Sequence, residues 1–348
     1  MAEARSKLKR DDGGAAMQTK KIINDGNEAV DEMLEGLVCA HPDLLRRSDR
    51  NPRAIVAVNG PRPGKVGLVI GGGSGHEPTF SGFVGKGLAD AAVIGDVFTS
   101  PTPDMVLDCA REASGGAGVL FMYGHYQGDV LNFDMAADLA AEEGITVRTI
   151  VSTDDVASAP IRETRRGVAG NFFIFKAAGA ACDQMKSLDE CERIARKANT
   201  ATATMGVALG PCSLPAIRKP NFDIGPDEIE IGMGIHGELG VERGTLKSAD
   251  EITDRMLDAI LADMKPARDA QVSVLVNSLG ATPLMELYIM NRRLSARLKD
   301  AGISVHKTHV GHYCTSLEMA GASITLIQLD EELRGLLDHP CDTASLRV

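Results

Sequence analysis

The sequence has no tryptophan, and aromatic residues make up only 4% of its 348 residues. With so few large aromatic side chains, a core has to be built from aliphatic ones, which the 44% hydrophobic content supplies. The length corresponds to about two domains or one large α/β unit. Thirty-seven glycines indicate many tight turns, as expected where strands and helices alternate.

Positive charges are outnumbered, with 37 lysine and arginine residues against 48 acidic ones, and the formal net charge is −11. This sign argues against nucleic acid or an anionic membrane as a partner, because both bind basic surfaces. No apolar run reaches the roughly 18 residues of a membrane span, and the polar N-terminus lacks the apolar region of a secretory signal. The seven cysteines are scattered without a CxxC pair, which is typical of reduced, mostly buried thiols in a cytoplasmic protein.

The order of apolar and polar segments predicts alternating strands and helices. Residues 1–19 are expected to be a disordered polar tail. Apolar runs at 65–70, 118–123 and 145–151 predict strands, each followed by a glycine-rich or polar segment. A helical stretch at 171–198 is expected to be two helices, because Ser187 and Glu190 form a capping-box pattern.

Further strands are expected at 228–233, 272–276, 303–310 and 323–329, and a helix at 284–298. The segment 206–226 is rich in proline and glycine and is the expected junction between two parts. The fold class is therefore predicted as α/β, with two α/β subdomains over 20–205 and 206–348 whose mixed or parallel sheets are flanked by helices.

Ligands of open α/β sheets bind beyond the carboxyl ends of the strands, which directs attention to the loops at 71–78, 124–129 and 232–240. The first of these reads "GGGSGHEP". It does not match a dinucleotide or P-loop pattern, since His76 stands where GxGxxG needs its third glycine and no GxxxxGK is present. A turn needing positive φ explains one or two glycines, but not a run that ends in His76 and Glu77.

Metal binding is the second chemistry to weigh. Spacing by three places His306, His309 and His312 on alternating faces of a strand, so ordinary strand and loop histidines are favoured over a ligand set. No metal site is predicted on this chain, and a metal hydrolase built on these histidines is the weakest alternative.

Acid–base chemistry is the third. His236 lies between glycines in "GMGIHGELG", where a surface loop histidine is the competing interpretation. Asp129 lies just after a predicted strand, where a helix N-cap is equally compatible. Together with His76, these residues indicate acid–base work on a small polar ligand.

Six segments in the same order carry a resemblance. The stretch from "GGGSGHEP" to "TSPTPD", followed by "GDVLNF", "RRGVAGN", "GMGIHGELG", "NSLGATPLMELY" and "YCTSLEMAGASITL", resembles the dihydroxyacetone kinase family, specifically its substrate-binding K subunit or domain. The resemblance extends from about residue 20 to about residue 338.

The resemblance implies a role for each candidate residue. His236 would attack the ketone carbonyl of the substrate and hold it as a covalent hemiaminal, which an alcohol such as glycerol cannot form. Asp129 would take the proton from the terminal hydroxyl that receives phosphate, and His76 would hydrogen-bond the substrate and assist proton transfer. The backbone of Gly73, Ser74 and Gly75 would line the pocket.

The resemblance also implies the partners. No cofactor is expected on this chain, because ATP or ADP with Mg²⁺ is bound by a separate L subunit in this family, with ATP or a phosphotransferase system as the phosphoryl source. Since the chain ends at Val348, a lone K subunit is expected, and a homodimer as in the family.

One block departs from the family pattern. "GHYQGD" has Gly124 where many members have lysine, and this loss is expected to make room for a larger ketose such as erythrulose or a branched sugar. Besides such a kinase, a ketone-sensing coactivator without catalysis stays an alternative.

Overall fold

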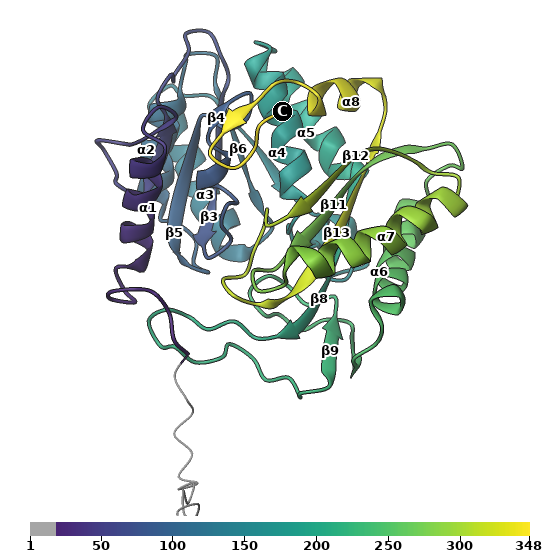
Figure 1. Ribbon diagram of the computed structural model, residues 1–348. Helices are drawn as coiled ribbons and strands as arrows, with labels where there is room; N and C mark the ends of the chain where they lie inside the picture. Colours follow the sequence, from purple (N-terminus) through teal and green to yellow (C-terminus); the bar gives the residue numbers. More distant parts are fainter. Residues whose placement is uncertain (1–18) are drawn as a thin grey trace, which may run out of the picture.

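The computed structural model describes residues 19–348, and the tail expected at 1–19 lies outside them except for its last residue. Within this range the chain forms eight α-helices and fourteen β-strands (Figure 1). The helices are α1 (Ala29–Ala40), α2 (Pro103–Ala113), α3 (Gln127–Glu142), α4 (Asn171–Asp183), α5 (Leu188–Ala201), α6 (Ala249–Met264), α7 (Leu284–Asp300) and α8 (Glu331–Leu337). None of these helices is long and apolar enough to cross a membrane.

The first sheet has the order β1-β2-β5-β3-β6-β7, and its last four strands run parallel. Its strands are β1 (Leu45–Arg47), β2 (Ala54–Ala57), β3 (Gly67–Ser74), β5 (Ala91–Val97), β6 (Val119–Gly124) and β7 (Val147–Ser152). The parallel strands are joined by crossover segments, as the alternating sequence pattern predicts.

The second sheet has the order β10-β9-β8-β13-β11-β12 and is antiparallel except between β11 and β12. Its strands are β8 (Thr202–Gly210), β9 (Glu228–Ile231), β10 (Glu242–Thr245), β11 (Gln271–Ser278), β12 (Ser304–Gly311) and β13 (Ala320–Leu329). A short ladder joins β4 (Gly85–Lys86) to β14 (Asp342–Thr343). The predicted class, mixed sheets flanked by helices, is confirmed.

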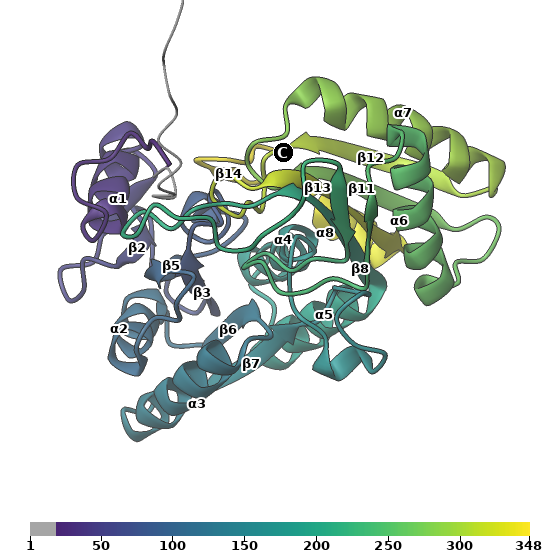
Figure 2. The same ribbon diagram turned by 90° about the horizontal axis from the view of Figure 1, so that it is seen from below.

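The elements stack in five layers. Helix α4 lies between the two sheets, while α2 and α3 cover the far side of the first sheet and α6 and α7 that of the second (Figures 1 and 2). The alternation of side chains along β3 explains this order, because Leu68 and Ile70 face the core shared with α4 whereas Val69 faces α2. Helix α4 is therefore buried on nearly every side, as its sequence "NFFIFKAAGAAC" requires.

The chain passes from the first sheet to the second before the predicted subdomain boundary at 205/206. Residue 206 lies inside β8, which begins at Thr202, so a division at 205/206 cuts a strand. The C-terminal residues also return to the first half, where β14 pairs with β4 and α8 contacts α4. The two-subdomain division stays a proposal, and the two sheets give it its physical meaning.

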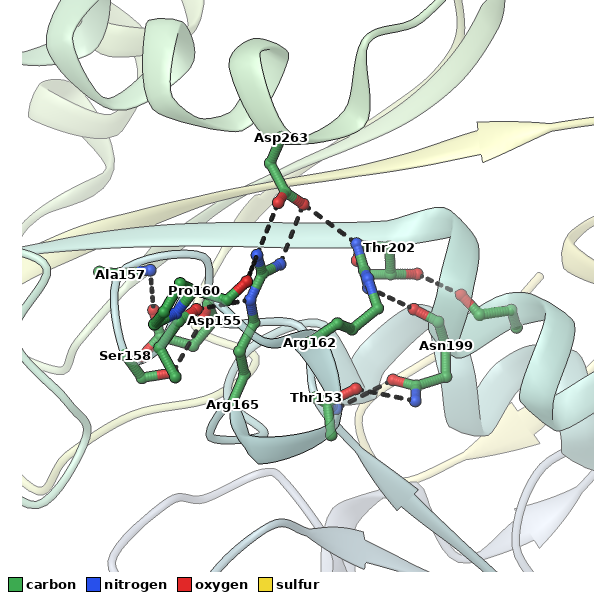
Figure 3. A network of polar contacts seen from close by, with 12 residues as sticks. Thr153, Asp155, Ala157, Ser158, Pro160, Arg162, Arg165, Asn199, Thr202 and Asp263 are labelled. Atoms are coloured by element: carbon green, nitrogen blue, oxygen red, sulfur yellow. Dashed lines mark hydrogen bonds and ion pairs between the residues drawn. The ribbon is translucent and has the colours of Figure 1, made fainter.

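A network of polar contacts joins the two halves (Figure 3). Arg162 and Arg165, in the segment that follows β7, both point toward Asp263 near the end of α6. Arg165 donates to Asp263 at 2.7 and 3.0 Å, and Arg162 donates to it at 3.1 Å. Because Arg165 is buried, this junction excludes most of the water that would weaken the ion pair.

The glycine run corrects one expectation. The predicted strand was to end at residue 70 and leave 71–78 as a loop, but β3 continues to Ser74. The three glycines pair with β5, and a Cβ on Gly71 would lie 2.5 Å from Cγ1 of Val93. Bare backbone is needed here because neighbouring chain approaches the strand closely. The split of 171–198 at Ser187 is confirmed, since Ser187 accepts from the N–H of Glu190 at the start of α5.

Candidate functional site

The structure brings the three candidate side chains to one small pocket of about 310 Å³. His76 follows the end of β3, Asp129 lies in the first turn of α3 just beyond β6, and His236 lies in the segment after β9. The pocket thus combines the carboxyl ends of two parallel strands with a loop of the second sheet. It is lined by Gly72, Gly73, His76, Thr79, Phe80, Gly124, Tyr126, Asp129, Gly167, Asn171, Ile235, His236 and Cys314.

The two histidines face each other, with their Nε2 atoms 3.0 Å apart. Nδ1 of His76 lies 2.7 Å from the carbonyl oxygen of Thr315, which can only accept a hydrogen bond. Nδ1 of His236 lies 3.1 Å from a carboxylate oxygen of Glu238. Nδ1 of His76 therefore carries the proton of that neutral ring and its Nε2 carries a lone pair, so the 3.0 Å contact between the two Nε2 atoms requires a proton on Nε2 of His236.

Burial keeps His76 uncharged. Removal from water, together with the charge of His236, lowers the pKa of His76 to about 3. The ring stacks on Phe98 at a centroid distance of 5.1 Å, and Phe98 also contacts the ring of His236 edge-on at 5.0 Å. His76 is thus a fixed, neutral ring over the whole physiological pH range.

Asp129 is buried in the pocket wall, and among the residues described its Oδ1 has no hydrogen-bond partner. Burial raises the pKa of Asp129 to about 6, and the Ser100 hydroxyl and His236 offset only part of that rise. The N-cap interpretation of Asp129 is wrong, because Tyr126 occupies the N-cap of α3. A buried carboxylate with one unpaired oxygen and a pKa near neutrality is suited to accept a proton.

A line of charged groups supports His236 from behind. Glu238 accepts from the backbone N–H of His236 at 2.9 Å and lies 3.9 Å from the guanidinium of Arg166, which in turn donates to the buried Asp155 at 2.9 Å. Burial alone would raise the pKa of Glu238, but the hydrogen bond and charge of His236 and the charge of Arg166 lower it to about 2. Glu238 is thus a permanent anion that fixes the tautomer and orientation of His236.

Gly124 does not create the expected extra space. A Cβ at this position would lie 2.9 Å from the carbonyl oxygen of Gly167 and 3.0 Å from Cε2 of Tyr126. The Tyr126 ring covers Gly124 and packs edge-on against His236 at 4.7 Å. The expectation of a roomier pocket is therefore wrong, because an aromatic ring covers the position from which a longer side chain would project.

The residues that line or support the pocket differ in part from those predicted. Gly73 lines the pocket, whereas Ser74 and Gly75 are not among its lining residues. Tyr126, Arg166 and Glu238 were not singled out from the sequence. Tyr126 and Glu238 lie three or fewer residues from a candidate, and Arg166 lies in "RRGVAGN", so the quoted segments contained a signal for all three.

The three spaced histidines lie elsewhere. Nε2 of His306 is 2.9 Å from a carboxylate oxygen of Asp338, and His309 packs edge-on against Phe172 at 4.9 Å. Across residues 19–348 no group of three or more histidine, cysteine or acidic side chains is arranged to hold a metal ion. Cys39 is exposed and the other six cysteines are buried and unbridged.

Comparison with known proteins identifies the family. The family model of the Dak1 domain matches residues 35–345. The chain belongs to the Dak1 family of dihydroxyacetone kinases. It is 45% identical over 329 residues to the PTS-dependent dihydroxyacetone kinase 2, dihydroxyacetone-binding subunit DhaK, of Listeria innocua, covering 94% of this chain and 99% of that protein.

Two further relatives of this Dak1 chain are also similar over nearly its whole length. The DhaK subunit of the PEP-dependent dihydroxyacetone kinase of Escherichia coli is 41% identical, with 94% of this chain and 99% of that protein covered. L-erythrulose 1-kinase of Mycolicibacterium smegmatis is 40% identical, but the match spans 94% of this chain and only 58% of that protein. These relatives are phosphotransferases with an alcohol acceptor.

Solved structures of dihydroxyacetone kinase proteins have the same fold as this chain. The dihydroxyacetone kinase of C. freundii superposes with a TM-score of 0.87 at 32% identity, covering 95% of this Dak1 chain and 60% of that chain. The dihydroxyacetone kinase operon co-activator Dha-DhaQ superposes with a TM-score of 0.85 at 33% identity, and the match covers 90% of this Dak1 chain and 97% of that chain.

Proposed function

We propose that this Dak1 chain is the ketose-binding subunit of a kinase that phosphorylates dihydroxyacetone or a close three- or four-carbon ketose. The observation that carries the proposal is the convergence of His76, Asp129 and His236 on one pocket of about 310 Å³. A pocket this small suits a small sugar rather than a nucleotide.

Covalent capture of the ketose is the role proposed for His236. Its Nε2 lone pair attacks the carbonyl carbon, so that an N–C bond forms while the C=O π bond breaks. The proton on Nε2 of His236 passes to Nε2 of His76 and on to the former carbonyl oxygen, while Nδ1 of His236 keeps its proton next to the ionised Glu238, 3.1 Å away. The lone pair on Nε2 of His76 then accepts a hydrogen bond from the new hydroxyl, which stabilises the hemiaminal.

Phosphorylation needs a base next to the terminal hydroxyl. Asp129 supplies it, because its unpaired Oδ1 lines the same pocket and burial has brought its pKa to about 6. The phosphoryl donor, ATP or ADP with Mg²⁺, is proposed to be held by a separate L-type subunit, with a phosphotransferase system as one source of phosphate. The names of the PTS-dependent relatives support that partnership, and the pocket itself is too small for a nucleotide.

The test is the fate of the carbonyl carbon. Dihydroxyacetone labelled with ¹³C at this carbon should give a protein-bound resonance in the region of tetrahedral carbon, and His236→Ala should abolish it. A bound ketose that keeps its ketone resonance would contradict covalent capture. Turnover with an L subunit and ATP, or with a phosphotransferase system, would then identify the donor, and Asp129→Asn should remove turnover while capture persists.

A second candidate function is a ketone-sensing coactivator. The structural likeness to the co-activator Dha-DhaQ favours it. The buried Asp129, with one oxygen unpaired, favours the kinase, because a sensor has no use for a base with a raised pKa. Capture without turnover, with every L subunit and donor supplied, would favour the sensor. The family resemblance further supports a cytoplasmic homodimer, which light scattering would check.

A further inference from the structure

Two side chains that line the pocket each have a buried polar atom without a protein partner. Over the described part of the chain, Oη of Tyr126 and Oδ1 of Asp129 are both buried without a hydrogen bond, and both side chains line the pocket. Buried polar atoms are nearly always paired. Two unpaired atoms on one wall therefore indicate two polar groups of a ligand.

The backbone fixes both groups relative to each other. Tyr126 is the N-cap of α3 and Asp129 follows three residues later in the first turn, so the two side chains share one rigid helix start. The Tyr126 ring meets the His236 ring edge-on at a centroid distance of 4.7 Å and an interplanar angle of 77°. Tyr126 and Asp129 are therefore two fixed neighbours of the nitrogen that holds the ketose.

A ketose with a hydroxyl on each side of its carbonyl carbon has one group for each of these atoms. In the proposed function the hydroxyl that receives phosphate belongs to Asp129, which leaves the second hydroxyl without a partner. Burial raises the pKa of Tyr126 well above its ordinary value, so that its hydroxyl remains a donor at neutral pH.

We propose that the hydroxyl of Tyr126 binds the second hydroxyl of the ketose, the one that is not phosphorylated, and thereby selects dihydroxylated ketones. This inference rests on the proposed capture by His236. Gly124 helps to hold this ring in place, because a Cβ there would lie 2.9 Å from the carbonyl oxygen of Gly167 and 3.0 Å from the Tyr126 ring, which would have to shift. Tyr126 thus fills the space beside Gly124 and adds a polar contact to the second hydroxyl of the ketose.

The test compares two ketones that differ by one hydroxyl. Capture of carbonyl-¹³C dihydroxyacetone and of carbonyl-¹³C hydroxyacetone is titrated by NMR with the wild type, Tyr126→Phe and Tyr123→Phe. Tyr123 is the matched control, since its hydroxyl is also buried without a partner in the described residues but it packs against Phe133 and does not line the pocket.

The wild type should bind dihydroxyacetone roughly ten-fold more tightly than hydroxyacetone, as one neutral hydrogen bond implies. Tyr126→Phe should lose that preference while its affinity for hydroxyacetone stays, and Tyr123→Phe should retain the preference. A wild type without preference, a Tyr126→Phe variant that keeps it, or an equal loss for both ketones would overturn the inference alone. Capture of neither ketone by the wild type would overturn the proposed function and this inference with it.

Discussion

At the scale of single residues, environment separates the roles of three titratable groups in one pocket. His76 is buried against Phe98 and is held neutral, Asp129 is buried with one oxygen unpaired and titrates near neutrality, and Glu238 is held as an anion. Groups whose pKa values are moved apart in this way are the usual basis for assigning acid and base roles.

Asp129 should set the acid limb of the pH profile. Its pKa is raised by burial from 3.8 to about 6, so the base form is lost as the pH falls through about 6 rather than through about 4. We expect kcat/KM to fall about tenfold per pH unit below that value, and Asp129→Asn to lower it by roughly 10²- to 10⁴-fold. Steady-state turnover with an L subunit between pH 5 and pH 8 measures both, and a profile that stays level to pH 5 would rule out Asp129 as the base.

The same residue should reduce stability. The folded pKa of Asp129, about 6, is higher than its value of 3.8 outside the fold, so stability falls as the pH rises from 4 through 6. Asp129→Asn should therefore raise the free energy of unfolding at pH 7 by roughly 1–3 kcal/mol, and the gain should shrink as the pH is lowered through 6.

Urea unfolding at several pH values measures this gain. Asp134→Asn on the exposed side of the same helix is the matched control and should change stability by less than about 0.5 kcal/mol. A destabilised Asp129→Asn protein would mean that the carboxylate has a structural partner.

At the scale of elements, hydrophobic patterns predicted most strands and helices. The apolar runs at 118–123 and 145–151 form β6 and β7, and the capping pattern at Ser187 separates α4 from α5. The end of β3 was not predictable in this way. Glycine has low strand propensity, and only the close approach of β5 and of the chain near Thr99 explains why Gly71–Ser74 stays extended.

The site was predictable only in part, because its residues carry local signals whereas their contacts join distant parts of the chain. His76, Asp129 and His236 each stand in a glycine-rich or polar segment near the end of a strand, which is a local signal. Their contact is not local, since His76 and His236 are 160 residues apart. The ring of Tyr126 over Gly124 depends on a backbone turn and on Gly167, so residue-by-residue comparison predicted empty space where the structure has an aromatic ring.

Gly234 tests the element that carries His236. A Cβ at this buried position would overlap the Glu238 carboxylate and the Arg166 guanidinium. Gly234→Ala should therefore move Glu238 away from Nδ1 of His236 and weaken ketose capture roughly ten- to hundred-fold, the worth of a charge-assisted hydrogen bond. Titration with carbonyl-¹³C dihydroxyacetone measures the effect. Gly244→Ala in β10, where a Cβ meets nothing within 4 Å, should leave capture unchanged, and equal effects of both substitutions would argue against the positioning role of Glu238.

At the scale of the whole molecule, the site exists only where the two halves meet. The second half supplies His236 as well as the backbone carbonyl groups of Thr315 and Tyr313, which bind His76 and Thr79. The polar junction of Arg162, Arg165 and Asp263 lies apart from the pocket and holds the same two halves together (Figure 3). The molecule thus separates the contacts that stabilise the interface from those that perform chemistry.

Removing the acidic partner of this junction should therefore reduce stability without changing capture. Asp263→Asn leaves the buried Arg165 facing a neutral amide, and breaking such a pair costs roughly 2–4 kcal/mol of the free energy of unfolding. The pKa of Asp263 is lowered, chiefly by its hydrogen bond to Arg165, so the loss should be full at pH 7 and should diminish only as the pH falls through the carboxylate range. Asp258→Asn on the same helix removes an exposed pair with Arg297 and should cost less than about 1 kcal/mol. Urea unfolding and ¹³C capture, measured on both variants, separate the two effects: a loss of capture by folded Asp263→Asn would mean that the junction also positions the site.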